Sequence, residues 1–267
     1  MLVLEAADFE RDVRLLQELK VGELRVGSGV YPAELSLGTA MGRLAARHPG
    51  LRIDVTTGDW RDTISALQTG QVDLVVVELS VLKGDQRLVV EALPEHAGVF
   101  FCRTGHPLLS EKNLTLERIF EFPFVGPKLA PRVATVLSQM LRQPELEQGT
   151  GDYLPSIKVD TVGLAKDAVA ASDAISVAPA TAITDSVAMG RLAPLPVRPP
   201  WLYTAYGFAW LKNRSLSPAA QAFMAEMRAV ETQLATAETH LLEAMFPSSE
   251  AAAVRRMPVR VAGGRRR

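Results

Sequence analysis

Cysteine and histidine are scarce in this sequence, and their scarcity excludes several kinds of site. Cys102 is the only cysteine, so an internal disulfide and any centre built from several cysteines, such as structural zinc or an iron–sulfur cluster, are excluded. The four histidines do not occur at the paired spacing of zinc ligands, which argues against a zinc enzyme; they are His48, His96, His106 and His240. The sequence therefore predicts no metal and no cofactor.

Long hydrophobic runs and a dominant charge are also missing. No segment approaches the roughly 18 consecutive apolar residues that a membrane span requires. The first residues mix acidic and basic side chains instead of placing a cationic segment before an apolar one, so we expect no signal peptide, a cytoplasmic chain and no membrane partner. Lys and Arg total 29, Asp and Glu total 30, and the net charge is −1. This balance argues against a surface that coats nucleic acid or an anionic membrane.

What the sequence does contain is an alternation of strand and helix patterns. The chain has 267 residues, 48% of them hydrophobic, enough for one large or two medium domains. Residues 73–77 form an apolar run typical of a parallel strand buried on both faces. The alternation predicts an α/β fold of two Rossmann-like lobes with a hinge and a ligand cleft. We expect lobe I to comprise about 22–103 plus 204–246, and lobe II about 104–203.

The two ends of the chain are predicted to lie outside these lobes. Residues 1–21 are predicted to form a linker helix, since its apolar residues recur at helical period; they are Leu2, Ala6, Phe9, Val13 and Leu16. This stripe could be covered by a partner helix, as in dimerisation, or by the helix's own domain. Residues 247–267 are rich in arginine and are predicted to form a disordered tail, with a phosphate-binding arm as the alternative.

Five short stretches form a pattern in which each is weak alone but all occur in a fixed order. They are residues 22–27, 47–53, 57–74, 105–108 and 173–179. Residues 67–74, for example, match L-x-x-G-x-[LV]-D-[LV]. Together they resemble the effector-binding domain of LysR-type transcriptional regulators, which implies a type 2 periplasmic-binding-protein fold. Ala174 in the last stretch and Ser172 just before it stand at or near positions where the family pattern has glycine.

The resemblance also implies partners. Regulators of this family carry a winged helix-turn-helix before the linker helix, and the sequence begins within that helix. A truncated or misassigned reading frame or a free-standing sensor domain would each explain this start. DNA is therefore expected as a partner only through a module not present in this chain. The resemblance further implies a small-molecule effector and a homodimer or tetramer.

In this family the effector is held by hydroxyls and backbone N–H groups at the turns that follow strands. Carried over position by position, the implied effector-binding residues are Ser28, Gly29, Val30, Tyr31, Thr57, Gly58 and Asp59 in the first lobe, and Gly126, Pro127, Lys128, Thr161, Val162 and Ser176 in the second. Helix N-termini near such turns favour an anion. A small organic acid is therefore one candidate for the effector.

Asp59 departs from this pattern, because the family often has Thr, Ser or Asn at its position. A carboxylate there would repel an acidic effector. Asp59 is therefore only a helix N-cap, or the effector offers an amine or a hydroxyl. Lys128 could supply the cation for an acid, although a lysine in a loop is more often simply solvated.

Three classes of function compete. A regulator's ligand sensor fits the motifs and the linker helix. A stand-alone solute-binding protein without DNA-binding activity is the alternative, and the absence of a signal peptide counts against a role in transport. An enzyme is not expected, because no nucleophile–base pair, phosphate-binding loop or metal cluster is evident. The sequence thus predicts a sensor domain with no catalytic residues.

Overall fold

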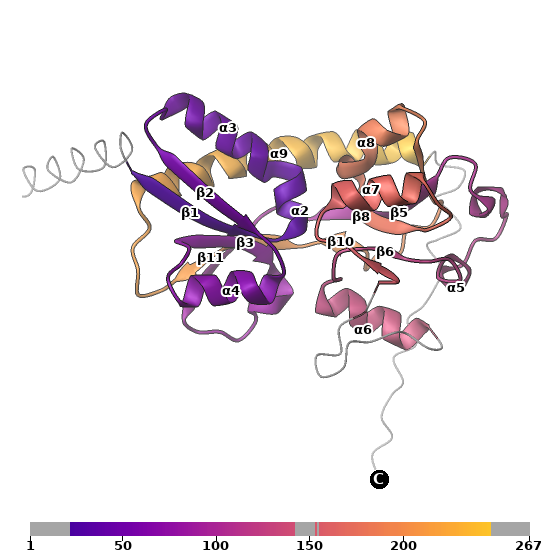
Figure 1. The fold of residues 1–267 in the computed structure, drawn as a ribbon, viewed down its shortest axis with the longest axis horizontal. Helices are drawn as coiled ribbons and strands as arrows, with labels where there is room; N and C mark the ends of the chain where they lie inside the picture. The colour runs from indigo at the N-terminus through magenta and orange to yellow at the C-terminus, as the bar shows by residue number, and fades with distance from the viewer. Residues whose placement is uncertain (1–21, 142–152, 154, 247–267) are drawn as a thin grey trace, which may run out of the picture.

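The computed structural model describes residues 22–141, 153 and 155–246, and these form two α/β lobes side by side (Figure 1). The predicted linker helix at 1–21 and the arginine-rich tail at 247–267 lie outside the described residues, as do residues 142–152 and 154. The two-lobed α/β fold predicted from the sequence is confirmed.

The first lobe is built on a five-stranded sheet in the order β2-β1-β3-β11-β4. Its strands are β1 (Glu23–Ser28), β2 (Arg52–Thr57), β3 (Leu74–Glu78), β4 (Leu88–Ala92) and β11 (Tyr206–Leu211). Its early helices are α2 (Val30–Pro32), η1 (Ala33–Leu37), α3 (Gly38–Arg47), α4 (Trp60–Gln68) and η2 (Leu79–Leu82). β1, β2 and β3 are parallel, whereas β11 runs antiparallel to both β3 and β4. The carboxyl ends of the three parallel strands therefore meet at one edge of the sheet.

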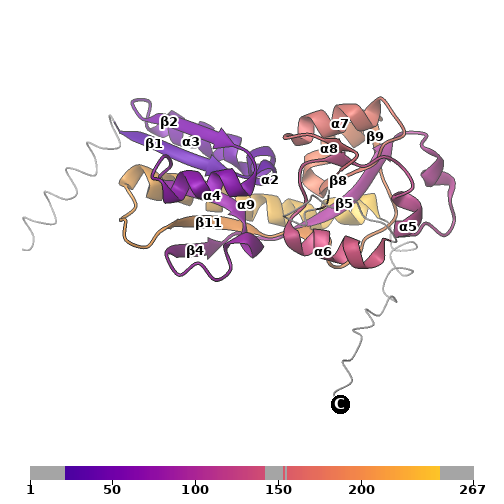
Figure 2. The same ribbon diagram turned by 60° about the horizontal axis from the view of Figure 1, so that its bottom comes forward.

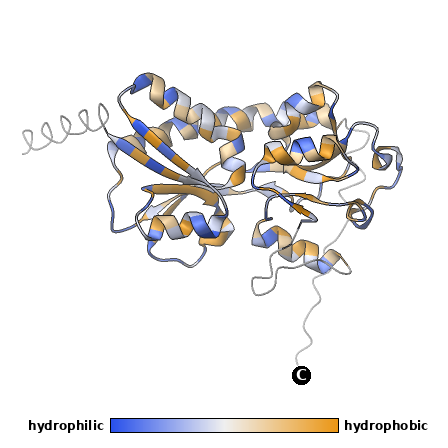
Figure 3. Cartoon of the chain, viewed as in Figure 1, coloured by the Kyte–Doolittle hydropathy of each residue, from blue (hydrophilic) through white to orange (hydrophobic). Residues whose placement is uncertain are grey.

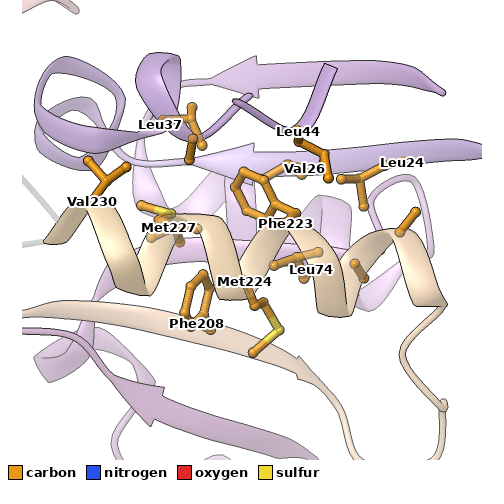
Figure 4. Packing of buried hydrophobic residues seen from close by; sticks show 14 of the residues in the cluster. Leu24, Val26, Leu37, Leu44, Leu74, Phe208, Phe223, Met224, Met227 and Val230 are labelled. Carbon is orange, nitrogen blue, oxygen red and sulfur yellow. The ribbon is translucent and has the colours of Figure 1, made fainter. Parts of the chain in front are cut away.

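Residue alternation decides which face of this sheet each helix covers. Leu74 and Val76 of β3 belong to the cluster beneath α3 and α9 (Pro218–Met245), whereas Val75 and Val77 pack with α4 on the other face. Phe223 of α9 lies beside Val26 and Leu44 in that first cluster (Figure 4). Both faces of β3 are covered, which explains its unbroken apolar run. Hydrophobic residues accordingly concentrate in the central strands, and hydrophilic ones on the outer helical faces (Figure 3).

The second lobe contains a sheet in the order β10-β5-β8, with β9 also paired to β5, and a short β6-β7 pair. Its strands are β5 (His96–Arg103), β6 (Val125–Gly126), β7 (Ile157–Lys158), β8 (Ser176–Pro179), β9 (Leu192–Pro194) and β10 (Tyr203–Thr204). Its helices are η3 (Pro107–Ser110), α5 (Leu116–Ile119), α6 (Pro131–Met140), α7 (Val162–Ala170) and α8 (Ala180–Ala188). Each of its described helices packs against a core of its own lobe.

The boundaries between the lobes differ from those expected. β5 pairs antiparallel with β8 and β9, so it lies in the second lobe. The chain therefore first passes from the first lobe to the second before His96, and not after residue 103 as expected. α9 was expected in the first lobe but extends along both (Figures 1 and 2). Its residues Phe223 and Met227 join the first lobe's core, and Leu242 packs against a second-lobe core. The helix thus braces the two lobes.

A buried polar cluster joins β5 and β11, which lie next to the two crossings of the chain between the lobes, to α9. His96 at the start of β5 is fully buried; its Nε2 lies 2.7 Å from Glu231 Oε2 and its Nδ1 lies 3.1 Å from Glu238 Oε2. The hydroxyl of Tyr206, at the start of β11, donates to Glu231 Oε1 at 2.7 Å. The backbone N–H of Ala97 donates to Glu238 Oε1 at 2.7 Å. Burial alone would lower the pKa of His96, but the two glutamates outweigh it and raise that pKa to about 9.

Candidate functional site

A cavity lies between the two lobes, at the carboxyl ends of β1, β2 and β3. Its described lining comes from both lobes and comprises Gly29, Val30, Tyr31, Pro32, Gly58, Asp59, Trp60, Glu78, Gly98, Pro127, Lys128, Leu129, Ala130, Arg132, Val133, Lys158, Asp160, Val177, Ala178, Pro179, Leu202, Tyr203, Thr204 and Tyr206. Its volume is about 100 Å³. This is smaller than the roughly 150 Å³ of an apolar cavity that holds benzene, so a ligand of that size requires the two lobes to move apart.

Apolar side chains make up most of the cavity wall. Val30, Tyr31 and Trp60 contribute from the first lobe, and Val177 and Leu202 from the second. The hydroxyl of Tyr31 donates across the cleft to the carbonyl oxygen of Val177 at 3.4 Å, and burial raises the pKa of Tyr31, so this hydroxyl is protonated. Such a wall favours burial of an apolar ligand surface.

Among the residues that the structure describes, three ion pairs cross from one lobe to the other with the same polarity. The acid belongs to the first lobe and the base to the second each time. Asp59 Oδ2 lies 3.5 Å from Lys128 Nζ, Glu78 Oε1 lies 3.0 Å from Arg132 Nε, and Glu34 Oε1 lies 2.7 Å from Lys166 Nζ. The first two pairs line the cavity. They hold the lobes together around it.

Arg132 makes the most extensive of these contacts. Besides Glu78, its guanidinium donates to the carbonyl oxygen of Trp201 at 2.9 Å and to that of Tyr203. Its Cζ also lies 3.9 Å from the centre of the Tyr203 ring, a cation–π contact. Arg132 thereby ties the start of α6 to the segment that returns to the first lobe.

Comparison with known proteins agrees with this geometry. The family model described as the LysR substrate binding domain matches residues 17–232. The chain belongs to this family. It is 36% identical over 214 residues to the SDS degradation transcriptional activation protein of Pseudomonas sp., covering 79% of this chain and 67% of that one. It is 27% identical over 226 residues to the HTH-type transcriptional regulator GalR of Pseudomonas putida, covering 85% of this chain and 56% of that one.

Solved structures of LysR regulatory domains share the fold. The reduced form of OxyR from N. meningitidis superposes with a TM-score of 0.61 at 17% identity, covering 78% of this chain and 95% of that one. The regulatory domain of MetR from N. meningitidis gives 0.59 at 16% identity, covering 84% and 95%. The type 2 periplasmic-binding-protein fold is therefore confirmed, and the chain is a ligand-sensing regulatory domain of the LysR family.

The structure brings part of the predicted site of this LysR domain together. Of the implied residues, those that line the cavity are Gly29, Val30, Tyr31, Gly58, Asp59, Pro127 and Lys128. Asp59 is both an N-cap and an ion-pair partner, since its Oδ1 accepts the N–H of Arg61 at 2.8 Å while its Oδ2 faces Lys128. That these residues bind an effector stays a prediction.

The other implied residues of the LysR domain are not among those lining the cavity. They are Ser28, Thr57, Gly126, Thr161, Val162 and Ser176. The hydroxyl of Ser28 is buried and donates to its neighbour's carbonyl, and Val162 is a core residue. Thr57 is exposed, whereas the hydroxyl of Ser176 is buried without a hydrogen-bond partner. Thr161 caps α7 by accepting the N–H of Leu164 at 3.2 Å.

Sequence reasoning missed several lining residues of the LysR domain. Trp60 directly follows the predicted cap, and Glu78 ends the strand formed by the apolar run, so the rule that ligands bind at strand ends could have identified both. Arg132 and Leu202 carry no comparable local signal, because their place at the cleft depends on how the second lobe folds back.

The remaining features of the described LysR domain are its cysteine, its potential metal ligands and its long helices. Cys102 is fully buried, as expected, and burial raises its pKa to about 12 against the opposing effect of Arg103, so the thiol stays protonated at neutral pH. Among the described residues, no group of three metal-ligating side chains could hold an ion. None of the helices in that part of the chain has the length and apolarity to cross a membrane.

Proposed function

We propose that the two lobes close on a small molecule in the cavity between them and report its presence without transforming it. The observation that carries this proposal is an apolar cavity with walls from both lobes, bridged by two ion pairs at its lining. The relatives are transcriptional regulators, which supports a sensor over an enzyme. No specific observation favours the stand-alone solute-binding protein.

Binding can change the lobe arrangement only if the molecule binds one arrangement better than another. In regulators such coupling typically amounts to about 1–3 kcal/mol. We propose that a homodimer or tetramer in the cytoplasm conveys this change to DNA through a module outside this chain. The named relative that activates SDS degradation supports transcription control as the output.

The chemistry of the effector follows from the pairing of Asp59 and Lys128. An organic acid would need Lys128 as its cation, whereas an amine or hydroxyl compound could use Asp59. Because the two side chains face one another, the choice between these candidates depends on whether that pair breaks.

Replacing Val30 by tryptophan tests the site. Val30 is half-buried at the cavity wall, so a bulky ring there should fill the space and weaken binding at least about tenfold. Val90→Trp is the matched control, because Val90 is 44% exposed on β4 and does not line the cavity. Titration calorimetry would use the compound that most raises the melting temperature in a screen of small acids, alcohols and amines.

The outcome would distinguish the proposed cleft from any other site. Both variants should keep the wild-type fold, as circular dichroism would show. Equal affinity of Val30→Trp and Val90→Trp for that compound would place the binding site elsewhere and refute the proposal.

A further inference from the structure

The charged side chains that line the described cavity leave little for a charged effector to bind. Its cations are Lys128, Arg132 and Lys158. Lys128 faces Asp59, and Arg132 is held by Glu78 and two carbonyl oxygens. Lys158 is exposed at the surface, where water and salt screen its charge.

Asp59 occupies one of the positions at this cavity that favour an anion, the N-terminus of α4. Its Oδ1 accepts the N–H of Arg61 at the N-terminus of α4, where the helix dipole favours a negative charge. Its Oδ2 lies 3.5 Å from Lys128 Nζ, and the side chains of the pair are only 18% and 14% exposed. The N-terminus of α4 and Lys128 are thus both engaged by a carboxylate of the protein itself.

A second carboxylate would meet two obstacles in this cleft. It would have to displace Lys128 from Asp59, or else lie beside the negative charge of Asp59 in a poorly solvated space. A buried anion without a partner is strongly unfavourable. An ammonium group faces the equivalent obstacle, because Asp59 and Glu78 are already paired with bases, and Asp160, the third acid of the described lining, is exposed to water like Lys158.

An uncharged molecule meets neither obstacle. It can cover Tyr31, Trp60 and Leu202 while the ion pairs remain intact, and a hydroxyl on it can donate to a carboxylate oxygen at the wall. On this basis, and resting on the proposed function, we infer that Asp59 is a specificity-determining residue that selects an uncharged, mainly apolar effector over the carboxylate of the same skeleton.

Asp59→Asn tests this inference with two matched pairs of probes, benzyl alcohol with benzoate and 1-hexanol with hexanoate. Asparagine preserves the size and the N-cap but removes the negative charge that faces Lys128. By titration calorimetry, the wild type should bind each alcohol at least about tenfold more tightly than the matching carboxylate. In Asp59→Asn the carboxylate affinity should rise about tenfold or more, with that for the alcohol almost unchanged.

Asp62→Asn is the control for the change of net charge. Asp62 lies in the first turn of the same helix, is exposed and does not line the cavity, so its variant should retain the wild-type preference. A wild type that binds the carboxylates as tightly as the alcohols, or an Asp59→Asn variant without improved carboxylate binding, would overturn the inference and leave the proposed function standing. Probes that bind neither form would also overturn the inference, whereas alcohols that bind Val30→Trp as tightly as wild type would overturn both.

Discussion

His96→Leu is expected to lower the free energy of unfolding by about 3–5 kcal/mol, the usual loss when one partner of a buried ion pair is removed. His96 and Glu231 have fully buried side chains, and that of Glu238 is 7% exposed. Leucine would leave the two glutamates facing an apolar side chain with their shared donor gone. Urea denaturation at neutral pH would measure the loss. His240→Leu is the control, because His240 is 84% exposed on α9, the helix that carries Glu231 and Glu238. Equal stability of the two variants would contradict a structural role for the cluster.

The same cluster predicts a pH dependence. The pKa of His96 is raised to about 9 in the folded chain, above the value of about 6.5 for an unfolded histidine. Its stabilisation is therefore fully present below about pH 6.5 and is lost as the pH rises through about 9. The stability gap between His240→Leu and His96→Leu should narrow over that window. A gap that widens as the pH rises would contradict the assignment.

Arg132→Met is expected to lower the free energy of unfolding by about 3 kcal/mol, because Glu78 and two carbonyl groups lose their donor together. Arg132 is 21% exposed and Glu78 is 16% exposed, so water compensates only in part. The variant should also loosen the lobes, seen as a larger radius of gyration in X-ray scattering. Arg132→Lys should not restore stability, since an ammonium cannot reproduce the planar fork of donors.

Arg52→Met is the matched control for that loss. The side chain of Arg52 is 78% exposed and its partner Glu23 lies 3.5 Å away on the first lobe, so the change should be within about 0.5 kcal/mol. If Arg132→Met were as stable and as compact as Arg52→Met, the contacts across the cleft would not hold the lobes together.

Local sequence patterns predicted the elements of this domain well. The N-cap offered for Asp59 is present, since Asp59 accepts the N–H of Arg61, and Thr115, Thr161 and Ser217 cap α5, α7 and α9 in the same way. These features depend on residues within one helical turn, so the sequence carries them directly.

The contacts between elements far apart in the chain were harder to predict from the sequence. β5 is apolar on both faces from Gly98 to Cys102, so its pattern could not show that it belongs to the second lobe. The two halves of α9 pack on different cores, which a pattern local to the helix does not reveal. The turns at Gly29 and Asp59 were predicted to face the cleft because each directly follows a strand. Arg132 and Leu202 were not predicted to do so. Their position depends on the folding of the whole second lobe.

A crystal structure of the chain with the tightest-binding compound from the screen is the most direct test of the cleft as an effector site. We expect the compound between the lobes, in contact with Tyr31, Trp60 and Leu202, with Lys128 still facing Asp59. A compound bound on the outer face of either lobe, with the cavity between them empty, would contradict this function.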